Sequence, residues 1–531
     1  TGLRWDVVAA ASPRIVEHRR SSMIRRSMST ARTLPVWAAI ETPPGGWSDL
    51  PAGELDVVVV GAGITGLTAA LALLRDGRRV VIIERKGVGA GETLRTSAHL
   101  ASALDDRFYR LAQQHGEDGA RLAAASHSAA IDWIEAQCEG AEDRCGFRRV
   151  PGYLFAHDGE IAELEKEVEA AIAAGLDAVL LEAGKETPAT LGRVLRFARQ
   201  ARVDAGAYLR LLAQEVRDAG GTFVRAEVSQ IKGGAPCTIT HRDGSMTARS
   251  VVAATNVPIH ETGTTYLKQA PYRSYVVAGS APVDLPDALY WDTAHPYLSV
   301  RLYRGDDGET EILVGGEDHK TGQADDPTAY VRLQEWTRQR FPNAGPFTHA
   351  WSGQIIEPAD GLAFIGADPD NENVYLVTGD SGNGLTHGTL GGLLICDLIQ
   401  SRENLWRDLY DPARKPLRAA GEWVRENANV ALQFRDWVRP ASVDVPEHIP
   451  LGGGAVLRRG IHRVAVYRAG DGGLHAFNAR CPHMGCVVHW SSEEKSWDCP
   501  CHGSRFDAAT GDILNGPTSE PLQPYELDDL R

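Results

Sequence analysis

The chain from residue 55 to 84 has the hydrophobic pattern of a parallel sheet covered by helices. Leu55–Val60 is a run of apolar, mostly β-branched residues, which is typical of a strand buried on both faces. Thr65–Asp76 repeats apolar residues at helical spacing, and Val80–Ile83 is a second buried strand that ends at Glu84. This stretch therefore predicts a strand, helix, strand unit of an α/β domain.

The pattern then changes several times. Helical spacing predicts helices over Asp105–Glu139 and Glu160–Ala174, and apolar runs predict strands over Gly221–Val228 and Val251–Asn256. The sequence from Tyr266 to about residue 350 is strand-rich and aromatic, which indicates an antiparallel sheet.

The last part of the chain predicts a separate small domain. Residues 401–440 are polar with helical spacing, as expected of a helical linker. From residue 441 onward short strands follow one another, including Arg463–Tyr467 and Leu474–Phe477. Such a succession of short strands is typical of a small all-β sandwich.

Composition narrows the class of protein. With 531 residues, 43% hydrophobic and 24% charged, the chain is long enough for two or three domains with substantial cores. No apolar run approaches the roughly 18 residues of a membrane-spanning helix. The formal net charge of −15 argues against nucleic acid and anionic membranes as partners. Eight cysteines are the usage of an intracellular protein, so a cytoplasmic location is expected.

Residues 1–50 are expected to form a poorly ordered leader. Their arginine pairs and serines resemble an organellar transit peptide, but arginine outnumbers lysine throughout the chain and the segment has no apolar signal core.

The turn after the first strand reads Gly61-Ala-Gly63-Ile64-Thr65-Gly66. Glycines in this pattern allow a tight turn and a close approach to a pyrophosphate, and the following helix N-terminus supplies N–H groups to it. Glu84, at the end of the second strand, stands where a ribose hydroxyl is bound. The fingerprint predicts a dinucleotide site without separating FAD from NAD.

Two short loops near the C-terminus carry cysteine and histidine in matched pairs. They read Cys481-Pro-His483-Met-Gly-Cys486 and Cys499-Pro-Cys501-His502-Gly-Ser504. A Rieske [2Fe–2S] cluster needs two thiolates on one iron and two imidazoles on the other. Cys481, His483, Cys499 and His502 supply that set. A tetrahedral zinc site is the alternative, because zinc accepts the same ligand types.

The loops resemble those of the Rieske proteins in respiratory and photosynthetic cytochrome complexes. The resemblance implies a disulfide between Cys486 and Cys501 and a hydrogen bond from the Ser504 hydroxyl to a cluster sulfide. Phe506 stands where that family often has a tyrosine that bonds a cysteine sulfur. Loss of that donor favours a potential in the middle of the Rieske range of about −150 to +300 mV.

Three further stretches resemble the D-amino-acid oxidase (glycine oxidase-like) superfamily. They are Gly87–Leu100, Gly361–Gly366 and Val374–Gly388. The resemblance implies FAD as the dinucleotide. Together with the fingerprint it gives the expected FAD-binding residues: Gly61, Gly63, Ile64, Thr65, Gly66, Glu84, Arg85, Gly91, Thr96, Ala98, His99, Leu100, Val228, Thr255, Asn256, Gly366, Gly379, Gly382, Asn383, Gly384, Leu385 and Thr386.

The expected fold is therefore α/β, with a Rossmann-like FAD-binding domain and an α+β substrate domain built on an antiparallel sheet, followed by a small all-β Rieske domain. The expected bounds are 51–115, 198–262 and 350–400 for the FAD-binding domain, 116–197 and 263–349 for the substrate domain, 401–440 for the linker, and 441–531 for the Rieske domain.

Five residues are candidates for the chemistry. His99 and His387 fall in the flavin-like motifs and could tune the flavin or carry a proton. Arg273 and Arg301 could clamp a substrate carboxylate, and Tyr275 could line the cavity. For each of the five, a hydrogen bond, an ion pair or core packing is the structural alternative.

The combined resemblance implies an FAD-dependent oxidoreductase. It is expected to oxidise a C–N bond of an amine or amino acid by hydride transfer to FAD, and to pass single electrons through the cluster to a ferredoxin, a cytochrome or the quinone pool. The first alternative is reverse electron flow, in which the cluster accepts electrons from a ferredoxin-like donor to drive a flavin-dependent reduction or monooxygenation. The others are oxygen as the acceptor and a non-enzymatic docking role for the cluster domain. Whether the chain forms a homo-oligomer stays open.

Overall fold

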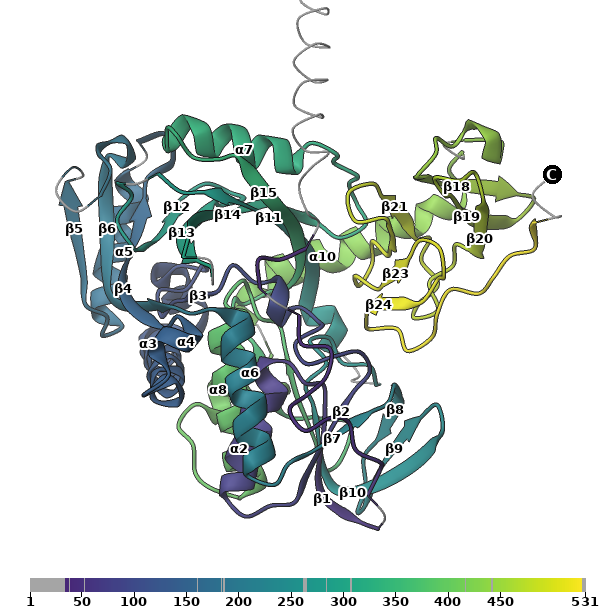
Figure 1. The fold of residues 1–531 in the computed structure, drawn as a ribbon, viewed down its shortest axis with the longest axis horizontal. Helices are drawn as coiled ribbons and strands as arrows, with labels where there is room; N and C mark the ends of the chain where they lie inside the picture. Colours follow the sequence, from purple (N-terminus) through teal and green to yellow (C-terminus); the bar gives the residue numbers. More distant parts are fainter. Residues whose placement is uncertain are drawn as a thin grey trace, which may run out of the picture.

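The computed structural model describes residues 34–527, except for residues 38, 52, 160, 183, 185–186, 261–264, 283, 306–307, 416 and 441–442. Most of the expected leader lies outside the described residues. Figure 1 shows a large α/β body joined to a small β-domain at the C-terminal end, which we call the C-terminal domain.

The first sheet of the large body follows the order β16-β17-β10-β1-β2-β7, and β9 and β8 extend it from β10. β1 lies between β10 and β2 and runs parallel to both, so its apolar residues are buried as the sequence predicts. The strands are β1 (Leu55–Val60), β2 (Val80–Glu84), β7 (Thr222–Arg225), β8 (Val228–Lys232), β9 (Cys237–His241), β10 (Gly244–Ala253), β16 (Phe364–Ala367) and β17 (Val374–Thr378).

Helices pack against this sheet and position the glycine-rich turn. α2 (Ile64–Arg75) follows that turn and packs against both α6 (Ala205–Asp218) and α8 (Gly384–Ile399). A Cβ on Gly66 would lie 1.9 Å from the carbonyl oxygen of Gly61. Only glycine lets the first turn of α2 approach the end of β1 this closely.

The second sheet of the large body is mainly antiparallel, in the order β15-β11-β14-β13-β12-β4-β6-β3, with β5 paired to β6. Its strands are β3 (His99–Leu100), β4 (Arg148–Phe155), β5 (Ala178–Glu182), β6 (Arg193–Arg202), β11 (Gln269–Ser280), β12 (Leu289–Asp292), β13 (Ser299–Arg304), β14 (Thr310–Lys320) and β15 (Phe347–Pro358). The accompanying helices are α3 (Phe108–Cys138), α4 (Glu142–Cys145), α5 (Ile161–Ala173) and α7 (Ala329–Arg340). This is the antiparallel sheet expected between the flavin-like motifs.

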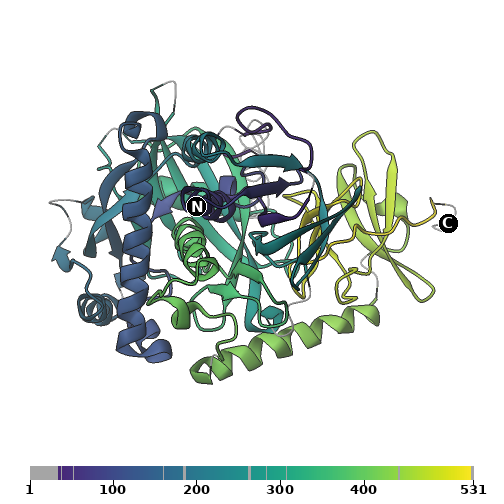
Figure 2. The ribbon, with the colours of Figure 1, turned by 90° about the horizontal axis from the view of Figure 1, so that it is seen from below.

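The connection to the C-terminal domain contains α9 (Arg407–Tyr410) and α10 (Ala420–Gln433), and α10 runs along the large body toward the C-terminal domain (Figure 2). That domain has two small sheets. One contains β18 (Gly453–Arg459), β19 (His462–Arg468) and β20 (Leu474–Asn478), and the other contains β21 (His489–Ser491), β22 (Ser496–Asp498), β23 (Arg505–Asp507) and β24 (Ile513–Asn515). The fold class predicted from the sequence, α/β followed by all-β, is confirmed.

Candidate cofactor sites

A cavity of about 280 Å³ lies where the two large sheets meet the C-terminal domain. Residues of the glycine-rich turn, of the end of β2 and of the N-terminus of α8 line it. The expected FAD-binding residues found on its wall are Gly61, Gly63, Ile64, Thr65, Glu84, Arg85, Gly91, Thr96, Val228, Thr255, Asn256, Gly379, Gly382, Gly384 and Leu385.

The remaining expected FAD-binding residues are off the wall: Gly66, Ala98, His99, Leu100, Gly366, Asn383 and Thr386. Several have packing or hydrogen-bonding roles instead. Leu100 is fully buried in the core, the Thr386 hydroxyl lies 2.7 Å from Nδ1 of His127, and Asn383 donates its side-chain amide to the Ser381 carbonyl.

The carboxylate of Glu84 is held at the mouth of the glycine-rich turn. Its Oε2 accepts a hydrogen bond from the Ala62 backbone N–H at 3.0 Å, and its Oε1 accepts one from Lys86 N–H at 2.8 Å. These bonds place an acceptor at the end of β2, where a ribose hydroxyl of a dinucleotide is bound.

Buried polar atoms of the cavity residues provide a test of whether a polar ligand fits. Asn256 Nδ2, Gln354 Oε1 and His387 Nε2 are buried and have no hydrogen-bond partner among the described residues. Each such atom costs about 1–3 kcal/mol if left unpaired. A ligand rich in both donors and acceptors, as FAD is, fits this wall.

His387 faces the cavity as a neutral imidazole. Its Nδ1 lies 2.9 Å from the Asp380 carbonyl oxygen. Because a carbonyl only accepts, Nδ1 carries the proton and Nε2 is left as an acceptor. Burial lowers the pKa of His387 to about 4. This candidate is therefore placed as a hydrogen-bond acceptor near neutral pH.

Buried carboxyl groups lie beside the same end of the cavity. The Ser381 hydroxyl lies 2.6 Å from Asp106 Oδ2 and 2.9 Å from Glu357 Oε2. One hydroxyl has one proton to donate, so satisfying both contacts requires that a carboxyl group be protonated. Burial raises the pKa of Asp106 to about 7, and it also raises the pKa of Glu357. This acidic group therefore holds a proton near neutral pH.

Asp380 continues this acidic group onto the cavity wall. Its Oδ1 accepts a hydrogen bond from the Ile356 backbone N–H at 2.9 Å. Burial raises the pKa of Asp380 to about 7. The sequence interpretation did not single out these acids, because they come from separate segments that only the fold brings together.

The other four candidates for the chemistry are not on the cavity wall. The Arg301 guanidinium is fully buried and donates to the Ala98 and Val203 carbonyls, at 2.6 and 3.0 Å. Tyr275 packs in the core, stacked on His319 with ring centroids 5.5 Å apart. The ring Nδ1 of His99 lies 2.9 Å from the Ser97 hydroxyl.

Arg273 also lies away from the cavity wall, at the contact between the large body and the C-terminal domain. Its buried guanidinium contacts the Ser352 hydroxyl and lies 3.2 Å from Glu494 Oε2. It is thereby engaged with a protein carboxylate.

The two cysteine and histidine loops come together in the C-terminal domain. The thiol groups of Cys481 and Cys499 are buried and within hydrogen-bonding reach of each other. The rings of His483 and His502 lie with centroids 5.0 Å apart. Two thiol groups and two imidazoles therefore converge, which fits the donor set of a Rieske cluster.

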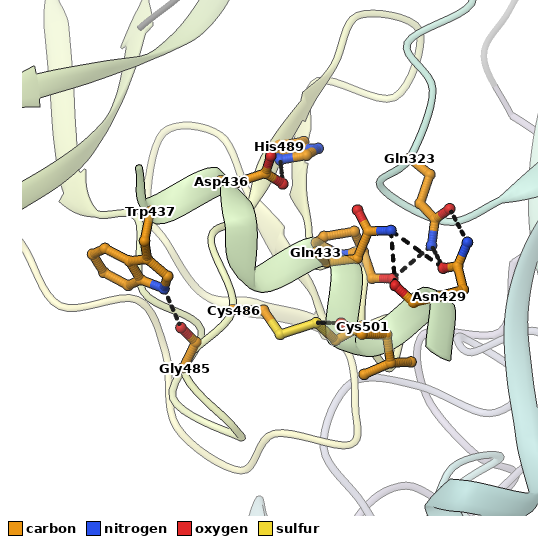
Figure 3. Close-up of a disulfide and its surroundings, with 11 residues drawn as sticks. Gln323, Asn429, Gln433, Asp436, Trp437, Gly485, Cys486, His489 and Cys501 are labelled. Atoms are coloured by element: carbon orange, nitrogen blue, oxygen red, sulfur yellow. Dashed lines mark hydrogen bonds and ion pairs between the residues drawn. A yellow bond between two sulfur atoms is a disulfide. The ribbon is translucent and has the colours of Figure 1, made fainter. Parts of the chain in front are cut away.

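A disulfide joins the two loops between Cys486 and Cys501, with a Cα–Cα distance of 6.5 Å. The bond lies beside α10 and the turn that follows it, where Trp437 donates to the Gly485 carbonyl at 3.0 Å (Figure 3). Sγ of Cys499 is also close to this pair, since the three sulfurs lie within 4.8 Å of one another. Two of them are bonded together and are not thiolates, so these three cysteines are not a metal-ligand set.

Tyr266 covers the histidine side of the loops. Its ring contacts the His483 ring edge-on at 5.0 Å and the His502 ring at 6.3 Å between centroids. Its hydroxyl donates to the His260 carbonyl at 2.6 Å. The histidine pair therefore faces the large body of its own chain.

A buried ion network holds the C-terminal domain on the large body. The Glu494 carboxylate lies 3.2 Å from Arg273, 3.4 Å from Arg505 and 3.7 Å from Arg95. Burial alone would raise the pKa of Glu494, but these guanidinium groups lower it to about 2. Glu494 is therefore ionised, and the network ties residues of both bodies together.

The C-terminal domain also forms part of the cavity wall, through Ile513, Gly516, Thr518 and Ser519. Sequence reasoning missed these residues, and it missed Gln354, Glu92 and Arg95, although the last two lie within the flavin-like stretch Gly87–Leu100. No local pattern indicates Gln354 or the residues of the C-terminal domain, because they become neighbours only when the domains dock.

The comparisons with known proteins agree with this architecture. Residues 56–398 match the family described as DAO, FAD dependent oxidoreductase, and residues 441–526 match the Rieske [2Fe-2S] domain. The chain belongs to the DAO family of FAD dependent oxidoreductases and carries a C-terminal Rieske domain. It therefore binds FAD and a [2Fe–2S] cluster, as the sequence predicted, and the zinc alternative is set aside.

A relative with the same architecture is the putative Rieske 2Fe-2S iron-sulfur protein YhfW of Bacillus subtilis, 30% identical over 92% of this chain and 99% of its own length. Glycine oxidase from Geobacillus kaustophilus has a similar fold, with TM-score 0.58 and 18% identity over 68% of this chain and all of its own. L-proline dehydrogenase from P. horikoshii gives TM-score 0.56 and 18% identity over 69% of this chain and 98% of its own. In the part of the chain that the structure describes, no helix has the length and apolar character needed to span a bilayer.

Proposed function

We propose that the protein is a dehydrogenase that oxidises a C–N bond of an amine or amino acid and delivers the electrons singly to an external carrier. Two similar structures are named for glycine and L-proline as substrates, which supports this substrate class. When bound, FAD would accept a hydride, and the [2Fe–2S] cluster would transfer one electron at a time. The neutral amine loses a hydride from carbon and becomes an iminium cation, C=N⁺; the two electrons of that hydride leave one at a time, and its proton is released.

The observation that carries the electron relay is the direct bonding between the cavity wall and the second cluster loop. Gln354 donates its side-chain amide to the Gly503 carbonyl at 2.7 Å, and Thr518 donates its backbone N–H to the Ser504 hydroxyl at 3.2 Å. Both Gln354 and Thr518 line the cavity. We therefore propose that the cluster exchanges electrons with the flavin of its own chain.

A residue of the cavity wall would bind the substrate, and the buried acidic group beside the cavity would handle its proton. His387, neutral and acceptor-only at Nε2, would accept a hydrogen bond from a bound amine. The buried carboxyl groups around Ser381 already hold a proton and would take part in its release. Binding the amine in neutral form removes the need for a strong base.

The test is an anaerobic titration of the purified protein with amines and amino acids, beginning with glycine and L-proline. Flavin absorbance and the EPR signal of the reduced cluster are followed together. We expect the flavin to bleach and the cluster signal to appear with the same substrate. Bleaching with a cluster that stays oxidised would refute the relay, and reduction of the flavin by a reduced ferredoxin without substrate would favour the reverse flow of electrons.

The acceptor and the location belong to the same proposal. We propose a ferredoxin, a cytochrome or a quinone as the one-electron carrier, since the cluster passes one electron at a time. A cytoplasmic location agrees with the four cysteines outside the cluster loops, Cys138, Cys145, Cys237 and Cys396, which are buried and form no disulfide in the described part of the chain.

A further inference from the structure

Gln354 lies on β15, between the cavity and the second cluster loop, and its side chain is 2% exposed. Its backbone N–H donates to Glu92 Oε2 at 2.6 Å, and its side-chain Nε2 donates to the Gly503 carbonyl at 2.7 Å. Gly503 stands between the cluster ligand His502 and Ser504. One buried side chain therefore connects the cavity wall to the backbone of the cluster loop.

The orientation of this amide is fixed by its partner. The Gly503 carbonyl can only accept, so the NH₂ group of Gln354 faces the cluster loop and Oε1 points elsewhere. Oε1 is buried and has no hydrogen-bond partner among the described residues, and Gln354 lines the cavity. A buried acceptor left unpaired costs about 1–3 kcal/mol, so the site calls for a donor from a ligand.

We infer that Gln354 is a positioning residue that couples FAD binding to the cluster loop: its Oε1 accepts a hydrogen bond from an N–H or O–H group of bound FAD while its Nε2 holds the Gly503 carbonyl. Hydrogen bonds arranged in a chain polarise and strengthen one another. The two contacts of Gln354 therefore reinforce each other. By linkage, a docked cluster loop raises the affinity for FAD, and bound FAD steadies the loop by the same factor.

The chain offers a matched control in Gln323. Its side-chain Nε2 donates to the Pro500 carbonyl at 3.1 Å, in the same cluster loop, and also contacts Asn429 (Figure 3). Gln323 does not line the flavin cavity. Gln323→Met and Gln354→Met each remove one side-chain amide bonded to that loop with little change in volume, but only the second also removes an acceptor from the cavity.

The experiment uses the full chain with its cluster and measures the FAD dissociation constant by titrating FAD into flavin-depleted protein. We expect Gln354→Met to raise this constant about tenfold, and Gln323→Met to change it less than about twofold. In the unsubstituted protein, FAD should also shift the EPR spectrum of the dithionite-reduced cluster. That shift should be lost in Gln354→Met and kept in Gln323→Met.

Unchanged FAD affinity in Gln354→Met, or an equal loss in Gln323→Met, would overturn the inference. If Gln354→Met does not fold, Gln354→Asn replaces it, because the shorter amide cannot reach both partners and should weaken FAD binding in the same direction. The inference rests on the proposed function only in assuming that the flavin and the cluster of one chain exchange electrons. Both measurements here are made without substrate, so a failed amine titration and a failed Gln354 test are separate results.

Discussion

At the scale of single residues, cysteine substitutions can distinguish the ligands of the cluster from the cysteines of the neighbouring disulfide. Cys499→Ala removes a ligand, so we expect iron and the EPR signal to be lost. The double substitution Cys486→Ser with Cys501→Ser removes only the bond between the loops and should leave a cluster in place. A disulfide closing a loop of this size stabilises by about 3 kcal/mol, so the double variant should unfold more easily. Iron analysis and thermal unfolding measure the two effects.

The opposite result would assign the ligands differently. If the double variant lost its iron while Cys499→Ala retained it, Cys486 or Cys501 would have to be a ligand. Cys396→Ser is a suitable control, because this buried free cysteine lies in α8 of the large body.

The buried carboxyl of Asp106 makes stability depend on pH. Burial raises its pKa from 3.8 to about 7, so between these values the folded protein binds more protons than the unfolded chain. Stability is therefore lost as pH rises through this window, by on the order of 4 kcal/mol. Asp106→Asn keeps an acceptor for Ser381 and removes the titration. We expect a larger gain in unfolding temperature over the unsubstituted protein at pH 8 than at pH 4.5.

The exposed residue Asp284 provides the control for this measurement. Asp284→Asn should leave the pH dependence of unfolding as it is. A gain from Asp106→Asn that is the same at both pH values would show that packing, and not protonation, causes it.

The sequence predicted well those residues that a local motif places. It predicted less well the residues that are placed by docking of the domains. Glu84 and the glycine-rich turn lie on the cavity wall because a strand, a turn and a helix place them there. Arg273 lies in a strand-rich, aromatic stretch, and its sequence context does not indicate which body its side chain will face. The carboxylate near it, Glu494, is more than two hundred residues away in the chain.

At the scale of elements, the observed bounds of one strand and one helix differ from the expected bounds. The strand pairs with two different neighbours, and side chains at the expected start of the helix form other hydrogen bonds. The expected strand Gly221–Val228 is divided into β7, which pairs with β2, and β8, which pairs with β9. The expected helix Asp105–Glu139 begins later, at Phe108 in α3. Asp105 instead accepts a hydrogen bond from the Tyr297 hydroxyl, and Asp106 accepts one from the Ser381 hydroxyl. The apolar periodicity of the sequence indicates neither the division of the strand nor the later start of the helix.

The close approach of the second cluster loop to the large body gives a prediction at this scale. Gly503 has φ +78°, and a Cβ there would lie 2.4 Å from both Gln354 Nε2 and Pro271 Cβ. Gly503→Ala should therefore weaken the docking of the loop. Its free-energy cost should exceed the roughly 1–2 kcal/mol that backbone strain alone accounts for. Gly452→Ala is the control, since its φ is +72° with nothing within 4 Å.

Limited proteolysis between the two bodies and retention of FAD after gel filtration measure this loosening. We expect faster cleavage and loss of FAD for Gly503→Ala, with the reduced cluster still visible by EPR. Equal behaviour of the two alanine variants would mean that backbone strain accounts for the whole effect.

At the scale of the whole molecule, the sequence predicted two cofactor domains but not that they share a wall. Each domain is indicated by a local motif, the glycine-rich turn in one and the cysteine and histidine loops in the other. Their contact consists of single residues scattered over both, among them Gln354, Arg273 and Glu494. Because none of these forms a sequence pattern, the contact between the C-terminal domain and the flavin cavity of the same chain emerged only from the fold.

The docking of the two bodies should depend on acid through Glu494. Its pKa is lowered in the folded protein from 4.5 to about 2, so its contribution is complete above pH 4.5 and is lost as pH falls toward 2. The size of this contribution is about 3 kcal/mol. We expect the unfolding free energy from urea titrations to fall over this range, and to fall less in Glu494→Gln.

At pH 7, Glu494→Gln should cost about 3–5 kcal/mol, because Arg273 is left buried beside a neutral amide. Glu447→Gln, at an exposed position in the C-terminal domain, should leave both values unchanged. The unfolding free energy could instead depend on pH below 4.5 in the same way with and without Glu494. The acid sensitivity would then come from other carboxylates, and the Glu494 network would not be what holds the cluster domain against the flavin cavity. Loss of both the slope and the domain contact in Glu494→Gln would show that docking of the C-terminal domain and the acid stability of the molecule depend on the same ion network.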